Sequence, residues 1–254
     1  MKVGESGQFM LSYSDDDGLT WSEPRNITQE VAPGKDWRMV FNGPGNGITR
    51  RDGTLVFPAQ YWDASGKSVG TPHASIIYSK DKGKTWHSGT SSKAFTSEAQ
   101  VVELNDGSLM LNARYEFGRN KKRNKAHDRS RSITITKDLG KTWTDHETSC
   151  TGSKALPEPI CQASILRVAS TKDGDQENIL AFFNPDTKGG RHNMTLKLSY
   201  DEGQTWTHKL LVNPRGCYGY SSISMVDKKT IGILYETAGG LIFEKINIKD
   251  VPKI

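Results

Sequence analysis

Four polar side chains could together bind an anion and activate a nucleophile, and each lies where an apolar segment begins or ends. Glu98 opens one such segment and Arg114 closes the next, while Arg191 and Tyr220 precede two later ones. Two guanidinium groups are planar, permanently charged donors that suit a carboxylate ligand. A tyrosine hydroxyl, with an ordinary pKa of about 10, becomes a useful nucleophile when a neighbouring carboxylate accepts its proton. A neutral phenol also avoids charge repulsion with an anionic substrate. The four residues therefore predict a site for a carboxylated sugar.

The elements that would position these side chains are indicated by an eight-residue pattern, Ser/Thr-x-Asp-x-Gly-x-Thr-Trp. It begins at Ser14, Ser79, Thr136 and Ser199, a spacing of about 60 residues. Aspartate can accept hydrogen bonds from backbone N–H groups ahead of it and glycine supplies a positive φ, so each copy predicts a hairpin tip. We expect these aspartate boxes to be structural, lying between the third and fourth strands of successive repeats on the rim away from the site.

The chain is expected to form one all-β domain over residues 1–254, with the architecture of a β-propeller. Hydrophobic residues make up 34% of it, alongside 25 Gly and 10 Pro, and the sequence shows little sign of long amphipathic helices. The blades of a propeller radiate about one axis, so equivalent strand ends in different blades converge on one mouth. This architecture would bring Glu98, Arg114, Arg191 and Tyr220 together.

Charge, cysteine and hydropathy patterns argue against nucleic acid, metal and membrane as partners. Much of the excess behind the net charge of +5 lies in residues 119–131, but that run has no interleaved aromatic residues, so we interpret it as a solvated loop that could attract acidic glycans. Cys150, Cys161 and Cys217 lack metal-ligand spacing, as do the six histidines, so no metal and no cofactor is expected. No apolar run approaches about 18 residues and residues 1–20 are polar, which predicts a soluble chain without a secretion signal.

Several short motifs, together with the four boxes, resemble the sialidase (neuraminidase) family. The motifs lie at residues 42–48, 53–58, 97–100, 111–114, 159–164, 191–194, 219–222 and 234–236. The boxes alone occur in other β-propellers, whereas boxes combined with the ordered Glu, Arg, Arg, Tyr series are strongly specific. The resemblance implies a six-bladed β-propeller. At roughly 60 residues a blade, this chain supplies about four blades plus flanking strands, so we expect an incomplete propeller.

The resemblance also implies a role for each candidate residue in an exo-α-sialidase. Tyr220 would attack the anomeric carbon, and Glu98 would polarise it. Arg114 and Arg191 would hold the sialic acid carboxylate, and Glu236 would steady a further arginine of the same cluster. The reaction would be retaining hydrolysis of terminal α-linked sialic acids on glycoproteins, gangliosides or oligosaccharides.

The sequence departs from the family at its N-terminus. In the family, two arginines and the aspartate that acts as general acid precede the first box, yet residues 1–13 contain neither Arg nor Asp. We therefore expect a chain that lacks the family's N-terminal part, which a missing segment or a partner chain would supply. If the chain alone were active, Asp36 or Asp63 would be the alternative acid.

Three classes of function stay open at this point. The chain is an exo-α-sialidase, a sialoglycan-binding propeller without catalysis (or an inactive fragment), or a structural repeat protein. Retention of Tyr220 together with Glu98 favours the enzyme, because a lectin needs neither a nucleophile nor its base. Tyr218 competes with Tyr220 as the nucleophile, but we interpret it as a pocket wall or a core aromatic. The resemblance implies a secreted, periplasmic or lysosomal protein and leaves a cytoplasmic one open.

Overall fold

The computed structural model describes residues 7–32, 37–65, 70–119, 129–150 and 152–254. Antiparallel strands dominate these residues, joined by one short helix, α1 (Thr28–Val31), and by single 3-10 turns. The all-β expectation is confirmed.

The strands of the described residues form five sheets that follow one another along the chain. The first sheet holds β1 (Met10–Leu11) and β2 (Arg25–Asn26). The second holds β3 (Trp37–Asn42), β4 (Ile48–Thr49), β5 (Leu55–Asp63), β6 (Pro72–Ser79), β7 (His87–Ser88) and β8 (Lys93–Ala94). The third holds β9 (Thr96–Glu103), β10 (Leu109–Tyr115), β11 (Ser132–Thr136) and β12 (Thr144–Asp145). The fourth holds β13 (Ser164–Ala169), β14 (Ile179–Pro185), β15 (Met194–Ser199) and β16 (His208–Asn213). The fifth holds β17 (Ser221–Asp227), β18 (Thr230–Thr237) and β19 (Gly240–Asn247).

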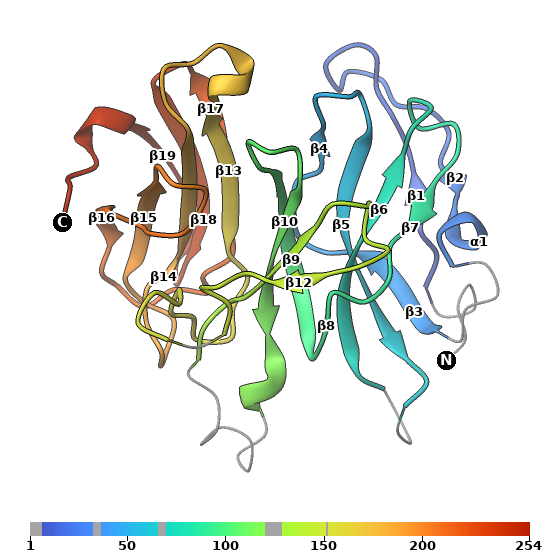
Figure 1. The fold of residues 1–254 in the computed structure, drawn as a ribbon, viewed down its shortest axis with the longest axis horizontal. Coiled ribbons are helices and arrows are strands. Elements are labelled where there is room, and N and C mark those ends of the chain that lie inside the picture. Colours follow the sequence, from blue (N-terminus) through green and yellow to red (C-terminus); the bar gives the residue numbers. More distant parts are fainter. Residues whose placement is uncertain (1–6, 33–36, 66–69, 120–128, 151) are drawn as a thin grey trace.

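Successive sheets stack on one another through apolar layers, as the blades of a propeller do. In Figure 1 the green strands β9 and β10 lie between the blue sheets of the N-terminal part and the orange and red sheets of the C-terminal part. Strand β14 shows why a continuous apolar run is needed inside such a stack. Ala181 and Phe183 pack toward the fifth sheet, whereas Leu180 and Phe182 pack toward the third. The expected incomplete propeller, with about four blades and flanking strands, is confirmed.

Each aspartate box closes a hairpin. In the third and fourth sheets it links the third strand to the fourth, as predicted, and in the second sheet it links β6 to β7, the third and fourth strands of the path β3-β5-β6-β7. In the second box, the carboxylate of Asp81 accepts the Thr85 N–H at 2.9 Å and the Thr85 hydroxyl at 2.6 Å. The indole of Trp86 folds back and donates to the Gly83 carbonyl at 3.1 Å. The box aspartate thus accepts these hydrogen bonds from residues of its own turn, in agreement with a structural role.

Candidate active site

Glu98 lies at a β-bulge in the pairing between β9 and β10. Gln100 pairs with Asn112 and Ser97 pairs with Arg114, so Glu98 and the residue after it oppose a single residue of β10. The φ of Glu98 is +38°, a backbone conformation that residues other than glycine seldom adopt. Bulges re-aim side chains near functional sites, and here the carboxylate of Glu98 contacts side chains of both its own sheet and another.

The hydroxyl of Tyr220 donates a hydrogen bond to Glu98 Oε1. Arg114 Nη1 lies 2.6 Å from the other carboxylate oxygen of Glu98 and 3.4 Å from the Tyr220 hydroxyl. Burial, followed by the hydrogen bond and negative charge of Glu98, raises the pKa of Tyr220 well above its ordinary value, although the charge of Arg114 opposes this. The phenol is therefore protonated at neutral pH, with its proton already directed at a base.

Arg114 is 4% exposed and lies between two carboxylates. Glu116 Oε1 is 3.5 Å from its Nε and also accepts the hydroxyl of Ser97 at 2.6 Å. The pKa of Arg114 is raised, because attraction to Glu98 and Glu116 outweighs the cost of burial. Its guanidinium group is thus a fixed permanent cation beside Tyr220.

A buried ion pair supports the end of β10 on which Arg114 lies. Arg131 Nη1 contacts Glu158 at 2.7 Å, with exposed fractions of 0% and 1% for the two side chains. The other carboxylate oxygen of Glu158 accepts the N–H of Tyr115 at 2.7 Å. Burial raises the pKa of Glu158, and the neighbouring arginine opposes that shift.

The interpretation of Arg131 as part of a solvated basic loop is therefore wrong. Its guanidinium group is buried because Asn112 and the Cys161 carbonyl, as well as Glu158, accept its hydrogen bonds. Sequence reasoning missed both members of this pair, because charged residues are seldom buried and no pattern marked these two. Residues 120–128 of the basic run lie outside the described residues.

Arg191 lies over the ring of Tyr220, whereas Glu236 contacts the Tyr220 backbone. The guanidinium carbon of Arg191 lies 5.8 Å from the centroid of the Tyr220 ring, while its N–H groups donate to the carbonyls of Tyr218 and Ile160 at 2.7 and 3.2 Å. Glu236 Oε2 accepts the Tyr220 N–H at 3.2 Å, and the Glu236 N–H donates to the Tyr220 carbonyl at 2.9 Å. Among the described residues, no lysine or arginine forms an ion pair with Glu236.

The structure thus brings Glu98, Arg114, Arg191 and Tyr220 together from three different sheets, and Glu236 lies on the adjoining strand. Residues 2–233 match the sequence profile of the BNR repeat-like domain. The chain belongs to the sialidase family of BNR-repeat proteins.

Relatives in this sialidase family match along almost the whole chain. A sialidase of Bacteroides fragilis (strain YCH46) is 45% identical over 256 residues, which cover 100% of this chain and 44% of the relative. A sialidase of Micromonospora viridifaciens is 30% identical and is matched over 94% of this chain and 35% of its own length. The solved structure of the Hadza microbial sialidase Hz136 superposes with a TM-score of 0.82 at 42% identity, covering 96% of this chain and 44% of that one. The chain spans less than half the length of these relatives.

Asp63 is not placed as an acid in this sialidase-family site. Its carboxylate accepts the Ser65 and Thr71 N–H groups at 3.0 and 2.7 Å and lies 3.0 Å from His73 Nε2. These hydrogen bonds outweigh the desolvation of the carboxyl and lower its pKa far below the ordinary value. A carboxyl that stays ionised is a poor proton donor at neutral pH, which argues against Asp63 as the replacement acid. Asp36 lies outside the described residues.

Tyr218 is neither a core aromatic nor a competitor for contact with Glu98. Its side chain is 63% exposed, and its backbone carbonyl accepts Arg191 Nη1. The interpretation of Tyr218 as a core residue is therefore wrong. Tyr220, not Tyr218, makes the hydrogen bond to Glu98.

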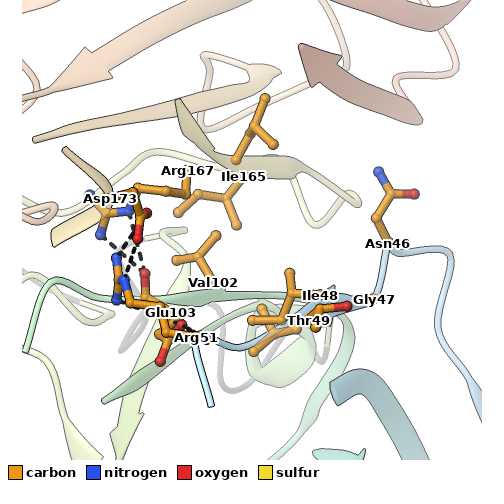
Figure 2. A pocket seen from close by; sticks show the side chains of 12 residues that line it. Asn46, Gly47, Ile48, Thr49, Arg51, Val102, Glu103, Ile165, Arg167 and Asp173 are labelled. Atoms are coloured by element: carbon orange, nitrogen blue, oxygen red, sulfur yellow. Dashed lines mark hydrogen bonds and ion pairs between the residues drawn. The ribbon is translucent and has the colours of Figure 1, made fainter. Parts of the chain in front are cut away.

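A separate cavity of about 390 Å³ lies between β4, β9 and β13, and none of the five candidate site residues lines it. Figure 2 shows its apolar wall, with Ile48, Val102 and Ile165, and a charged cluster at one side. In that cluster Arg51 Nε lies 2.8 Å from Asp173, so these two lining charges pair with each other.

In the part of the chain that the structure describes, no His, Cys, Asp and Glu side chains gather in a way that would hold a metal ion. None of the helices in that part has the length and apolar character needed to cross a membrane.

Proposed function

We propose that this chain carries the nucleophile, its base and part of the carboxylate-binding group of an exo-α-sialidase, a retaining glycoside hydrolase. The observation that supports this most directly is the hydrogen bond from Tyr220 to Glu98, with Arg114 beside both. A tyrosine nucleophile is a known exception to the two-carboxylate scheme of glycosidases. The substrates would be glycans with terminal α-linked sialic acid.

In the first step, the Tyr220 oxygen forms a bond to the anomeric carbon while its proton passes to Glu98. The bond from that carbon to the leaving-group oxygen breaks, and this oxygen takes a proton from a general acid or from water. In the second step, water attacks the anomeric carbon and releases a proton to solvent or to the conjugate base of the acid. The Tyr220 oxygen leaves and recovers its proton from Glu98. Two displacements on one carbon retain its configuration.

Arg114 and Arg191 are proposed to bind the carboxylate of the sugar. A permanent planar cation is suited to that task, and Arg114 is held in place by Glu98 and Glu116. Three carboxylates lie around this group: Glu98 and Glu116 pair with Arg114, and Glu236 accepts the Tyr220 N–H. Anion binding by the described residues alone should therefore be weak. The proposed partner of Glu236 is a further cation of the complete protein.

Covalent trapping tests the proposed nucleophile without requiring a general acid. Incubation with 2,3-difluorosialic acid should form a bond between the Tyr220 oxygen and the anomeric carbon, with release of fluoride, a good leaving group. Digestion and mass spectrometry should then locate the added mass on the peptide that contains Tyr220. Tyr220→Phe should abolish labelling, whereas Tyr218→Phe, the matched control, should not. Labelling at another residue, or none at saturating reagent, would count against the proposal.

A further inference from the structure

Three sheets each place one buried glutamine beside the site. Gln60 lies on β5, Gln100 on β9, and Gln162 just before β13, with exposed fractions of 3%, 4% and 1%. A buried amide is costly unless its donors and acceptor are hydrogen-bonded. The hydrogen-bond partners of these three amides therefore indicate which part of the site each one holds.

Gln60 binds the backbone of Glu98. The bulge removes Glu98 from regular pairing with β10, and its N–H donates to Gln60 Oε1 at 2.8 Å. A residue other than glycine held at positive φ is strained and persists only where its surroundings fix it. The amide of Gln60 is one of the groups that fix it here.

Gln162 binds both backbone groups of Ser221, the residue after Tyr220. Its Oε1 accepts the Ser221 N–H at 2.9 Å, and its Nε2 donates to the Ser221 carbonyl at 2.9 Å. The same Nε2 lies 3.1 Å from the carbonyl of Pro44, to which Gln100 also donates, at 3.0 Å. Gln100 therefore holds the Pro44 loop, but it contacts the backbone of neither catalytic candidate.

The contact between Glu98 and Tyr220 spans sheets whose strands do not pair. Glu98 lies on β9 and Tyr220 directly precedes β17, and β13 packs between these two strands. No ladder hydrogen bond therefore sets the distance between the two side chains, and each depends on how its own backbone is held. A misplacement of about 1 Å can cost about 10²-fold in rate.

We propose that Gln60 and Gln162 are positioning residues that set the hydrogen bond between Glu98 and Tyr220, a role that rests on the function proposed for that pair. Gln60 fixes the bulge that presents the carboxylate, and Gln162 fixes the strand entry that presents the phenol. Loss of either amide should lengthen the Glu98–Tyr220 contact without removing either group.

The test is nuclear magnetic resonance of the Tyr220 hydroxyl proton and of labelled tyrosine Cζ at neutral pH, with Tyr220→Phe to assign the signals. In the unmodified chain the hydroxyl proton should resonate far downfield and exchange slowly, because a carboxylate accepts it. Gln60→Met and Gln162→Met should each move that signal upfield and speed its exchange on the order of tenfold. Gln100→Met, a buried glutamine of the same sheet stack, is the matched control and should leave the signal in place.

Asparagine keeps the amide on a side chain that is shorter by one methylene. Gln60→Asn and Gln162→Asn should therefore shift the Tyr220 hydroxyl signal in the same way as the Met variants, with less loss of stability. The proposal is overturned if the Tyr220 signal moves no more in these variants than in Gln100→Met. It is also overturned if every Gln60 and Gln162 variant fails to fold, because the amides would then support the fold and not the pair. The signal requires no turnover, so failure of the covalent trapping experiment would be distinguishable from failure here.

Discussion

At the scale of single residues, the site combines a phenol that is hard to ionise with a carboxylate that is already in contact with it. The raised pKa of Tyr220 means that a free tyrosinate would be rare at neutral pH. In the proposed mechanism, attack on carbon would therefore coincide with proton transfer to Glu98. Arg114 holds the second oxygen of that carboxylate and so leaves the first one directed at the phenol.

Glu98→Gln should slow covalent trapping at Tyr220 by about 10²–10⁴-fold, since general base catalysis contributes about that much. An amide has nearly the same shape as the carboxylate but accepts a proton poorly. The measurement is the rate of labelling by 2,3-difluorosialic acid, followed by mass spectrometry. Glu244→Gln, which removes a carboxylate of β19 outside the site, should label at the unmodified rate. An unchanged rate in Glu98→Gln would mean that another group takes the proton.

The pairing of Glu98 with Tyr220 could be anticipated from sequence, because both lie at strand ends within recognisable motifs. The backbone conformation that brings them into contact could not be anticipated. Nothing in the residues 97–100 indicates that Glu98 has a positive φ, because a bulge depends on how two strands register and not on local propensity. Burial of Arg131 was likewise hidden, because it requires Glu158, which lies 27 residues away.

At the scale of elements, the box turn needs two consecutive residues at positive φ. Gly83 has a φ of +83°, and the residue before it, Lys82, has a φ of +58°. The sequence predicts the positive φ of Gly83 but not that of Lys82, because lysine has no preference for the left-handed region. The hydrogen bonds of the box aspartate to the residues ahead must therefore hold the lysine there.

Gly83→Val should lower the free energy of unfolding by about 1 kcal/mol or more, because a β-branched side chain is strained at positive φ. Urea denaturation followed by tryptophan fluorescence would measure this. The control is Gly216→Val, at a glycine with open space around it and no positive φ. Equal effects of the two substitutions would contradict the argument from backbone conformation.

The box aspartates should make stability fall at acid pH. Hydrogen bonds from the side chain and backbone of Thr142 lower the pKa of Asp138 from 3.8 to about 2. Because the folded-state pKa lies below the unfolded one, this carboxylate stabilises the fold above pH 4, and its contribution is lost as the pH falls through about 2. Asp138→Asn should flatten that part of a plot of urea midpoint against pH. Asp250→Asn, at an exposed carboxyl outside the boxes, should not change it.

At the scale of the whole molecule, the fifth sheet has one face buried and one face open. Ile231, Ile233 and Tyr235 pack against the fourth sheet, whereas Leu234 and its partner Phe243 are 42% and 55% exposed on the other face. The four boxes predicted a repeat fold correctly, but they could not reveal this sheet, which has hairpins of a different kind and no box. Counting boxes therefore misses one sheet.

The open face should make the chain self-associate, because monomers rarely expose contiguous apolar patches of this kind. Val226 and Leu241 extend the patch, with 44% and 69% of their surface exposed. Sedimentation velocity over a range of concentrations should show association that Leu241→Ser combined with Phe243→Ser reduces. Ile254→Ser, which removes a lone exposed apolar side chain, is the control. A chain that stays monomeric at high concentration would contradict this prediction.

The chain by itself should hydrolyse natural sialosides at least about 10²-fold more slowly than a complete sialidase, because a positioned acid is worth about 10²–10⁴-fold. Among the described residues, the carboxyls near Tyr220 are already engaged: Glu98 with Arg114, and Glu236 with the Tyr220 backbone. Asp63 is held ionised. A phenolate leaving group departs without help from an acid. Hydrolysis of a sialoside that carries one should therefore fall less than hydrolysis of sialyl-lactose. The prediction is checked by measuring both hydrolysis rates for this chain and for the Bacteroides fragilis relative. Rapid cleavage of sialyl-lactose by the chain alone would show that it has an acid of its own.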